Sequence, residues 1–143
     1  MLSALAFCGA PSDSIFSPNS YSILDGLRAQ LQEAHAAGDA DAIATMFDPA
    51  GSLQLPQEPA VVGRASIRSR YAELFEDFLV NLAMFAVESS VRDGRVVDRG
   101  TFNLILTPRA GGPNVQSTGE YSLAGYLGDG GVRVEELRFE SAS

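Results

Sequence analysis

The second half of the chain alternates apolar and polar residues with a period of two, and this pattern restricts the fold more than any other feature. The alternation predicts strands at about 81–92, 95–108, 115–127 and 132–140. The segments "RDGR" at 92–95 and "GDGG" at 128–131 are short and contain glycine, as tight β-hairpins require. A longer connection, "PRAGGPN", lies between the second and third strands. We therefore expect four long strands that pair antiparallel in sequence.

The first half has the spacing of helices instead. Ser20 or Ser22 is a candidate N-cap of a first helix, whose apolar residues recur at helical spacing until Gly38. Asp39 is the expected N-cap of a second helix, which Pro49 should end.

A short strand, "GSLQLP", follows, and a third helix begins after Gly63. Helices that are segregated from antiparallel strands indicate an α+β fold, and a sheet that curves around helices commonly leaves a pocket between them. We expect an N-terminal arm at 1–20 and a single domain at 21–143.

The charge and the metal-binding residue types exclude several functions. Ten Lys and Arg residues stand against 18 Asp and Glu, for a net charge of −8. Such a chain repels nucleic acid and anionic membranes, so neither is an expected partner. With one cysteine, Cys8, and one histidine, His35, no metal site and no bound cofactor are expected. The apolar N-terminus lacks a basic region, and no apolar run is long enough to span a membrane, so we expect a cytoplasmic protein.

Four phrases in this order resemble the SnoaL-like and ketosteroid-isomerase-like branch of the nuclear transport factor 2-like superfamily. They are "AHAAGDADAIATMF", "SLQLPQEPAVVGRASIRSRY", "RGTFNLILTP" and "STGEYSLAGY". The resemblance covers about residues 21–141. It implies a cone-shaped, curved antiparallel sheet wrapped around three N-terminal helices, the cystatin-like α+β barrel, with an apolar pocket and usually a homodimer. Members of this group include both enzymes and proteins without known activity, so the fold alone does not fix the function.

The resemblance also implies where catalytic polar groups would lie, and this chain lacks them. Steroid isomerases of the group carry a basic Asp where this chain has Leu55, a Tyr at the position of Leu31, and a second Asp near Ser122. The cyclases carry an acid at the position of Leu137, two residues before an aromatic that matches Phe139. Leucine cannot transfer a proton, so these positions exclude both reactions in their usual form.

His35 is the first candidate site residue. Helical spacing places it on the same face as Leu24 and Leu31, and the resemblance places it on the pocket wall. The imidazole titrates near neutral pH and could act as a base, but this would need an orienting partner that the sequence does not identify. We interpret His35 as an aromatic-sized part of the wall, with a specific ligand contact or a general base as the alternatives.

Glu120 is the second candidate. Pairing the last two strands through the "GDGG" turn places Glu120 and Ser122 on one face with Leu137 and Phe139, next to Phe102. A carboxylate among apolar side chains would have a raised pKa, which is a catalytic pattern, whereas at the rim it would simply be solvated. A register slip of one residue would bring Tyr121, Glu136 and Arg138 to the pocket instead.

These observations predict a binding or accessory protein for a small apolar molecule. The expected pocket residues are Leu31, His35, Leu55, Tyr71, Phe102, Glu120, Ser122, Leu137 and Phe139. The alternatives are an isomerase, hydrolase or cyclase that uses His35 or Glu120 as its base, and a module for assembly.

The sheet face that is not covered by helices suggests a homodimer, because an apolar face is seldom left exposed. Its expected apolar residues are Val97, Ile105, Leu123, Val132 and Val134.

Overall fold

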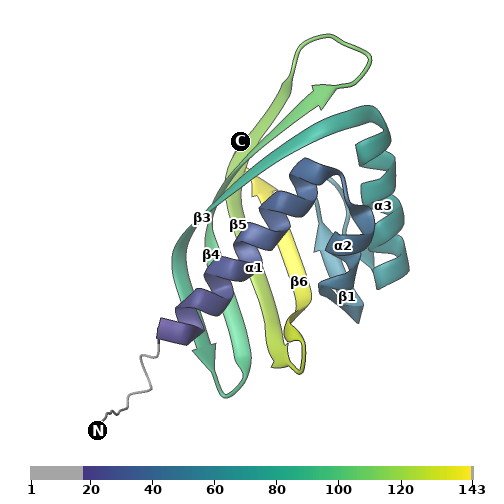
Figure 1. The fold of residues 1–143 in the computed structure, drawn as a ribbon. Coiled ribbons are helices and arrows are strands. Elements are labelled where there is room, and N and C mark those ends of the chain that lie inside the picture. The colour runs from purple at the N-terminus through teal and green to yellow at the C-terminus, as the bar shows by residue number, and fades with distance from the viewer. Residues whose placement is uncertain (1–17, 143) are drawn as a thin grey trace, which may run out of the picture.

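The computed structural model describes residues 18–142. Three helices and six strands follow one another along the chain (Figure 1). Their bounds are α1 Pro18–Ala37, α2 Ala40–Thr45, β1 Phe47–Gln54, β2 Val61–Val62, α3 Arg64–Asp77, β3 Phe78–Arg92, β4 Arg95–Pro108, β5 Val115–Gly128 and β6 Gly131–Ser141. The three helices precede the four long strands, as the sequence predicts, and the architecture is α+β.

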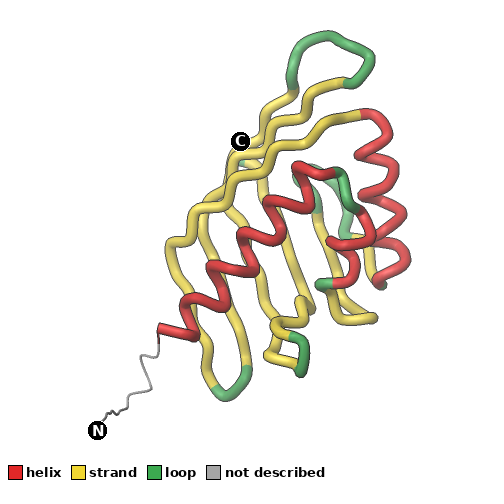
Figure 2. Tube along the Cα trace, in the orientation of Figure 1, coloured by secondary structure: helices red, strands yellow, loops and turns green. Residues whose placement is uncertain are grey.

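The strands form one open, curved sheet in the order β2-β1-β6-β5-β4-β3. The long helix α1 runs across the concave face, and α2 and α3 pack at one end of it (Figures 1 and 2). Neighbouring strands are antiparallel except β1 and β6, which pair in parallel, with Leu53 opposite Leu137. The sheet is therefore not purely antiparallel, because the chain passes through β2, α3, β3, β4 and β5 before β6 returns beside β1.

The helix boundaries are partly as predicted. Gly38 ends α1 with a φ of +67°, and its N–H donates to the carbonyl of His35. Asp39 caps α2 by accepting from the backbone N–H of Ala42 at 3.0 Å. The helix α1, however, begins at Pro18 and not after Ser20 or Ser22. Most of the predicted arm at 1–20, including Cys8, lies outside the described residues.

The prediction that Pro49 ends the second helix is wrong. The helix α2 ends at Thr45, and Pro49 lies inside β1. Proline has no N–H to donate, so a strand tolerates it where the ladder is interrupted. The pairing of β1 with β6 is irregular between Phe47 and Ser52, and Pro49 occupies that interruption.

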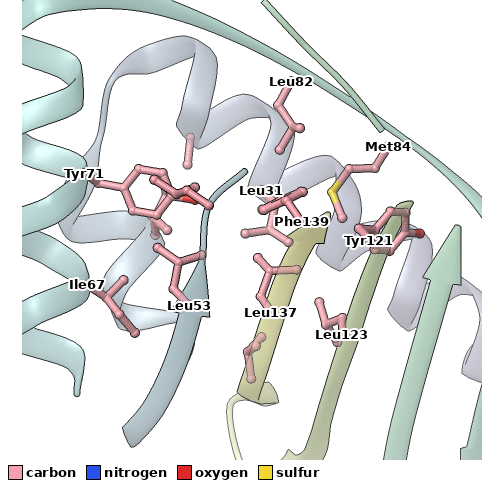
Figure 3. Packing of buried hydrophobic residues seen from close by; sticks show 14 of the residues in the cluster. Leu31, Leu53, Ile67, Tyr71, Leu82, Met84, Tyr121, Leu123, Leu137 and Phe139 are labelled. Carbon is pink, nitrogen blue, oxygen red and sulfur yellow. The ribbon is translucent and has the colours of Figure 1, made fainter. Parts of the chain in front are cut away.

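A single apolar cluster fills the space between the helices and the concave face. The strands contribute alternate residues, and α1 and α3 contribute one stripe each. Figure 3 shows Tyr71 pointing from α3 into this interior, near Leu53, and Leu137 and Phe139 following one another along β6. None of the helices among residues 18–142 is long and apolar enough to cross a lipid bilayer.

Candidate functional site

An interior cavity of about 170 Å³ lies between α1, α3, the loop after β1 and the sheet. Its buried end is formed mainly by leucine and aromatic side chains, whereas its outer rim includes exposed residues. The lining residues, in chain order, are His35, Leu55, Pro56, Gln57, Glu58, Tyr71, Leu74, Leu82, Leu104, Leu106, Val115, Ser117 and Phe139.

His35 and Tyr71 are the polar residues of the buried end. His35 Nε2 lies 2.8 Å from the Tyr71 hydroxyl, and His35 Nδ1 lies 2.6 Å from the carbonyl oxygen of Leu31. The two rings meet edge-on, with centroids 4.9 Å apart, and Phe75 stacks on Tyr71 and lies edge-on to His35. His35 is 2% exposed and Tyr71 is fully buried. The imidazole is thus held by hydrogen bonds at both nitrogens, and its partner is a hydroxyl and not a carboxylate.

Burial sets the protonation of this pair. It lowers the pKa of His35 to about 4, because no nearby anion compensates for the loss of water around an imidazolium. Burial also raises the pKa of Tyr71 well above its ordinary value. Both groups are therefore neutral at neutral pH. A base this weak, with its free nitrogen already bonded to a hydroxyl, is poorly suited to removing a proton from a substrate.

The three leucines that replace polar groups of the resembling enzymes are all buried. Leu55 lines the cavity, and Leu31 and Leu137 lie in the core beside it. Phe102 and Phe139 form an edge-to-face pair 5.1 Å apart, and of the two Phe139 lines the cavity. The structure thus brings His35, Leu55, Tyr71 and Phe139 to the cavity and places Leu31, Phe102 and Leu137 in the surrounding core.

The predicted positions of Glu120 and Ser122 are wrong. Glu120 is exposed and pairs with Glu140, and Ser122 pairs with Arg138. Both border a hollow of about 320 Å³ on the convex side of the sheet. Tyr121 points inward in their place, with Phe139 opposite.

A β-bulge accounts for this error. The pairing of β5 with β6 is regular from the hairpin turn as far as Gly125, which lies opposite Val134. At the next step Ala124 lies opposite Glu136, so Glu135 is an extra residue in β6. The extra residue shifts the pairing of β5 and β6 by one position beyond it. Leu137 and Phe139 therefore lie opposite Leu123 and Tyr121, and Glu136 and Arg138 lie on the outer face with Glu120 and Ser122. Gly125 is the signal in the sequence: a Cβ there would lie 2.2 Å from the carbonyl oxygen of Arg133.

Sequence analysis missed several residues at the rim and on the wall. Gln57, Glu58, Val115 and Ser117 lie in or next to loops, where periodicity carries no information about facing. Glu58 is held by Arg70, whose Nε and Nη2 donate to its carboxylate at 2.9 and 2.6 Å.

Sequence analysis also missed a second polar cluster, around Asp98, which is fully buried. Its carboxylate accepts from Arg28 at 2.7 Å, from the hydroxyl of Tyr121 at 2.9 Å and from the hydroxyl of Ser89 at 2.6 Å. Burial and the negative charge of Asp98 raise the pKa of Tyr121. Arg28, Ser89, Asp98 and Tyr121 are called the Asp98 cluster below. Asp98 follows Val96 at the strand period, which is a signal that it faces inward.

Within the described part of the chain, no three His, Cys, Asp or Glu side chains lie close enough together to hold a metal ion. The cavity offers apolar contact together with the hydrogen-bonding groups of His35, Tyr71 and the rim.

Solved structures of other proteins share this fold. A ketosteroid isomerase-like protein from Erwinia carotovora atroseptica has a TM-score of 0.75 and 19% identity, over 90% of this chain and 99% of that one. A candidate dehydratase from the nuclear transport factor 2-like family, from Streptomyces avermitilis, has a TM-score of 0.73 and 17% identity, over 87% and 97%. A candidate calcium/calmodulin-dependent protein kinase II association domain from Xanthomonas campestris has a TM-score of 0.76 and 15% identity, over 91% and 93%.

No family model matches the sequence, and no curated protein matches it significantly. At identities of 15–19% the structural similarity demonstrates a common fold and leaves the activity open.

Proposed function

Since the chain has the nuclear transport factor 2-like fold, we propose that it binds a small apolar molecule in the interior cavity. The observation that carries this proposal is an apolar cavity of about 170 Å³ whose buried polar groups, His35 and Tyr71, are already bonded to each other. A cavity of about 150 Å³ lined by apolar side chains is large enough for a benzene-sized ligand. Binding of one small ring is therefore the simplest use of this space.

Catalysis by the two candidate bases is less well supported. Glu120 lies on the opposite face of the sheet from the cavity. His35 is neutral and engaged at both nitrogens, with no carboxylate to stabilise an imidazolium. A role in assembly alone would leave the cavity unexplained, because a vestigial pocket would be expected to fill with side chains.

Two measurements test the binding proposal. Native mass spectrometry of freshly purified protein should detect a retained small molecule. Titration with toluene should shift the methyl NMR signals of Leu55, Leu82 and Leu104, which line the cavity. Failure of both measurements would contradict the proposal.

Matched variants locate the site. Val115 is 49% exposed at the rim, so Val115→Phe should narrow the entrance and weaken toluene binding without unfolding the protein. Val62 is also an exposed strand valine but does not line the cavity, so Val62→Phe should leave the affinity unchanged. Equal effects of the two changes would place the binding elsewhere.

We also propose that the protein is a homodimer through the convex face of the sheet, and that it is cytoplasmic. This face carries Leu79, Phe85 and Val97, which are 51%, 58% and 40% exposed, with Ile105 partly buried. Leu123, Val132 and Val134, predicted to lie there, pack in or against the core instead, because the extra residue Glu135 shifts the pairing of β5 with β6.

The expected dimer is consistent with an exposed apolar surface of this kind. Analytical ultracentrifugation at micromolar concentration should show a species of twice the 15.1 kDa chain mass. A replacement of Phe85 by Glu should produce the monomer, whereas Val62→Glu, on the edge strand β2, should not.

A further inference from the structure

The direction of the hydrogen bonds at the buried end of the cavity restricts what can bind there. The carbonyl oxygen of Leu31 can only accept, so the 2.6 Å contact requires that His35 Nδ1 carry the hydrogen. His35 Nε2 then has a free lone pair, and the Tyr71 hydroxyl, 2.8 Å away, must donate to it. The tautomer of the ring and the direction of the hydroxyl follow from one backbone carbonyl.

This chain of bonds uses every donor of the pair. The N–H of His35 is bound to Leu31, and the O–H of Tyr71 is bound to His35. The remaining capacity of the pair is to accept a hydrogen bond at the Tyr71 oxygen. The other polar lining side chains, Gln57, Glu58 and Ser117, lie at the exposed or half-exposed rim. A ligand atom at the buried end therefore meets leucine, phenylalanine and an acceptor, but no free donor.

We infer that the cavity selects a single-ring aromatic ligand whose inner end is apolar or donates a hydrogen bond, such as a phenol, and rejects ligands that must place a carbonyl or carboxylate there. This inference rests on the proposed function, because it specifies the ligand of that same cavity. A carbonyl oxygen at the buried end would face the Tyr71 oxygen and lose its hydrogen bonds to water without replacement. A phenol hydroxyl can instead donate to Tyr71, and its ring contacts Leu82, Leu104 and Phe139.

Phenol, toluene and benzaldehyde are suitable probes because each carries one small substituent on the same ring. We expect phenol and toluene to bind the wild-type protein roughly tenfold more tightly than benzaldehyde, the affinity ratio that an unpaired buried acceptor costs. Calorimetry or ligand-detected NMR at pH 7 measures the three affinities.

Two substitutions, one at each residue of the pair, test the direction of the hydrogen bond. His35→Phe removes the acceptor of the Tyr71 hydroxyl, so its O–H becomes free to bind a ligand oxygen. The ratio of benzaldehyde to phenol affinity should then rise roughly tenfold. Tyr71→Phe leaves His35 Nε2 as an acceptor, so the preference for phenol should remain. Tyr121→Phe is the matched control, because its hydroxyl bonds Asp98 and Tyr121 does not line the cavity; it should leave all three affinities unchanged.

The outcomes separate the inference from the proposed function. If all three probes bind in the cavity and the ratio is the same in the wild type and in His35→Phe, the direction of the bonds does not select the ligand and the inference is wrong, whereas the proposed function stands. If none of the probes binds, both are wrong. Should His35→Phe fail to fold, Tyr71→Phe still decides, because a loss of the phenol preference in that variant would overturn the inference.

Discussion

Two inward-reaching polar side chains, Arg28 and the buried His35, lie on the same face of α1 and have opposite properties. Arg28 and His35 are seven residues apart, or roughly 10 Å along a helix. Arg28 belongs to the Asp98 cluster, which is charged and in which three side chains donate hydrogen bonds to one carboxylate. His35 reaches Tyr71, forming a neutral pair that borders a cavity. The comparison indicates that the charged cluster fixes α1 to the sheet, whereas the neutral pair leaves one side open for a ligand.

The physical reason for the difference is the cost of burying charge. A buried carboxylate needs a cation and several donors, and once these are in place they fill the space around it. A neutral imidazole and a hydroxyl can satisfy each other with two hydrogen bonds, so apolar space can remain beside them. Changes to the charged cluster should therefore mainly affect stability, and changes to the neutral pair should mainly affect binding.

The largest expected effect comes from removing the carboxylate. Asp98→Ala leaves Arg28, whose side chain is 12% exposed, without its buried partner, and it also leaves two hydroxyls unpaired. We expect a loss of about 3–5 kcal/mol in the free energy of unfolding, measured by urea denaturation. Ser89→Ala removes one donor only and should cost less, about 1.5–3 kcal/mol, as for one hydrogen bond to a charged group. A loss below about 1 kcal/mol in Asp98→Ala would show that the cluster does not anchor α1.

The next effect is a dependence of stability on pH that belongs to His35. In the unfolded chain His35 takes up a proton as the pH falls through about 6.5, whereas in the folded protein its pKa is lowered to about 4. Its contribution to stability is therefore complete above pH 6.5 and is lost as the pH falls from there toward 4. Between pH 7 and pH 5 the free energy of unfolding should fall by on the order of 2 kcal/mol because of this group.

The control for this prediction is His35→Phe, which has no imidazole to titrate. The free energy of unfolding, measured by urea denaturation, should fall less between pH 7 and pH 5 in this variant than in the wild type, by on the order of 2 kcal/mol. Equal differences in the two proteins would mean that His35 is not held in its neutral form, and the contrast between the charged cluster and the neutral pair would fail.

The two tyrosine hydroxyls compare the clusters directly, and the smallest effect is expected at Tyr71. Tyr121 donates to a carboxylate and Tyr71 to a neutral ring. Tyr121→Phe should cost about 1.5–3 kcal/mol of stability, and Tyr71→Phe about 0.5–1.5 kcal/mol. Thermal and urea unfolding of the two variants measure the difference. The reverse order would indicate that the neutral pair, and not the Asp98 cluster, holds the helix against the sheet.

Local chemistry in the sequence was sufficient for most of the secondary structure. The strand alternation and the glycine-containing turns located β3 to β6 to within a few residues. Gly38 correctly marked the end of α1, and Asp39 correctly marked the start of α2. Helical spacing placed His35 and Tyr71 inward, where they line the cavity. These features depend on neighbours in the chain, so they can be recognised without the tertiary structure.

The errors occurred where distant segments meet. Pro49 belongs to a strand because β6 pairs with the chain on both sides of it, and Glu120 faces outward because Glu135 is an extra residue in the partner strand. Glycines inside the strands gave a partial warning. A Cβ at Gly100 would lie 2.0 Å from the carbonyl oxygen of Phe85, beside a break in the β3–β4 register between Ala86 and Glu88. Such a glycine marks a close backbone approach but does not show which strand carries the extra residue.

The sequence by itself determined the α+β class, the order of the elements, the presence of leucine at positions 55 and 137, and the inward facing of His35. Only the tertiary structure decided that the partner of His35 is Tyr71, that Asp98 meets Arg28, and that Tyr121 and not Glu120 faces the interior. The reason is that periodicity reports which side of its own element a residue occupies. Hydrogen-bond partners depend instead on register and on the crossing of elements, and one bulge changes both.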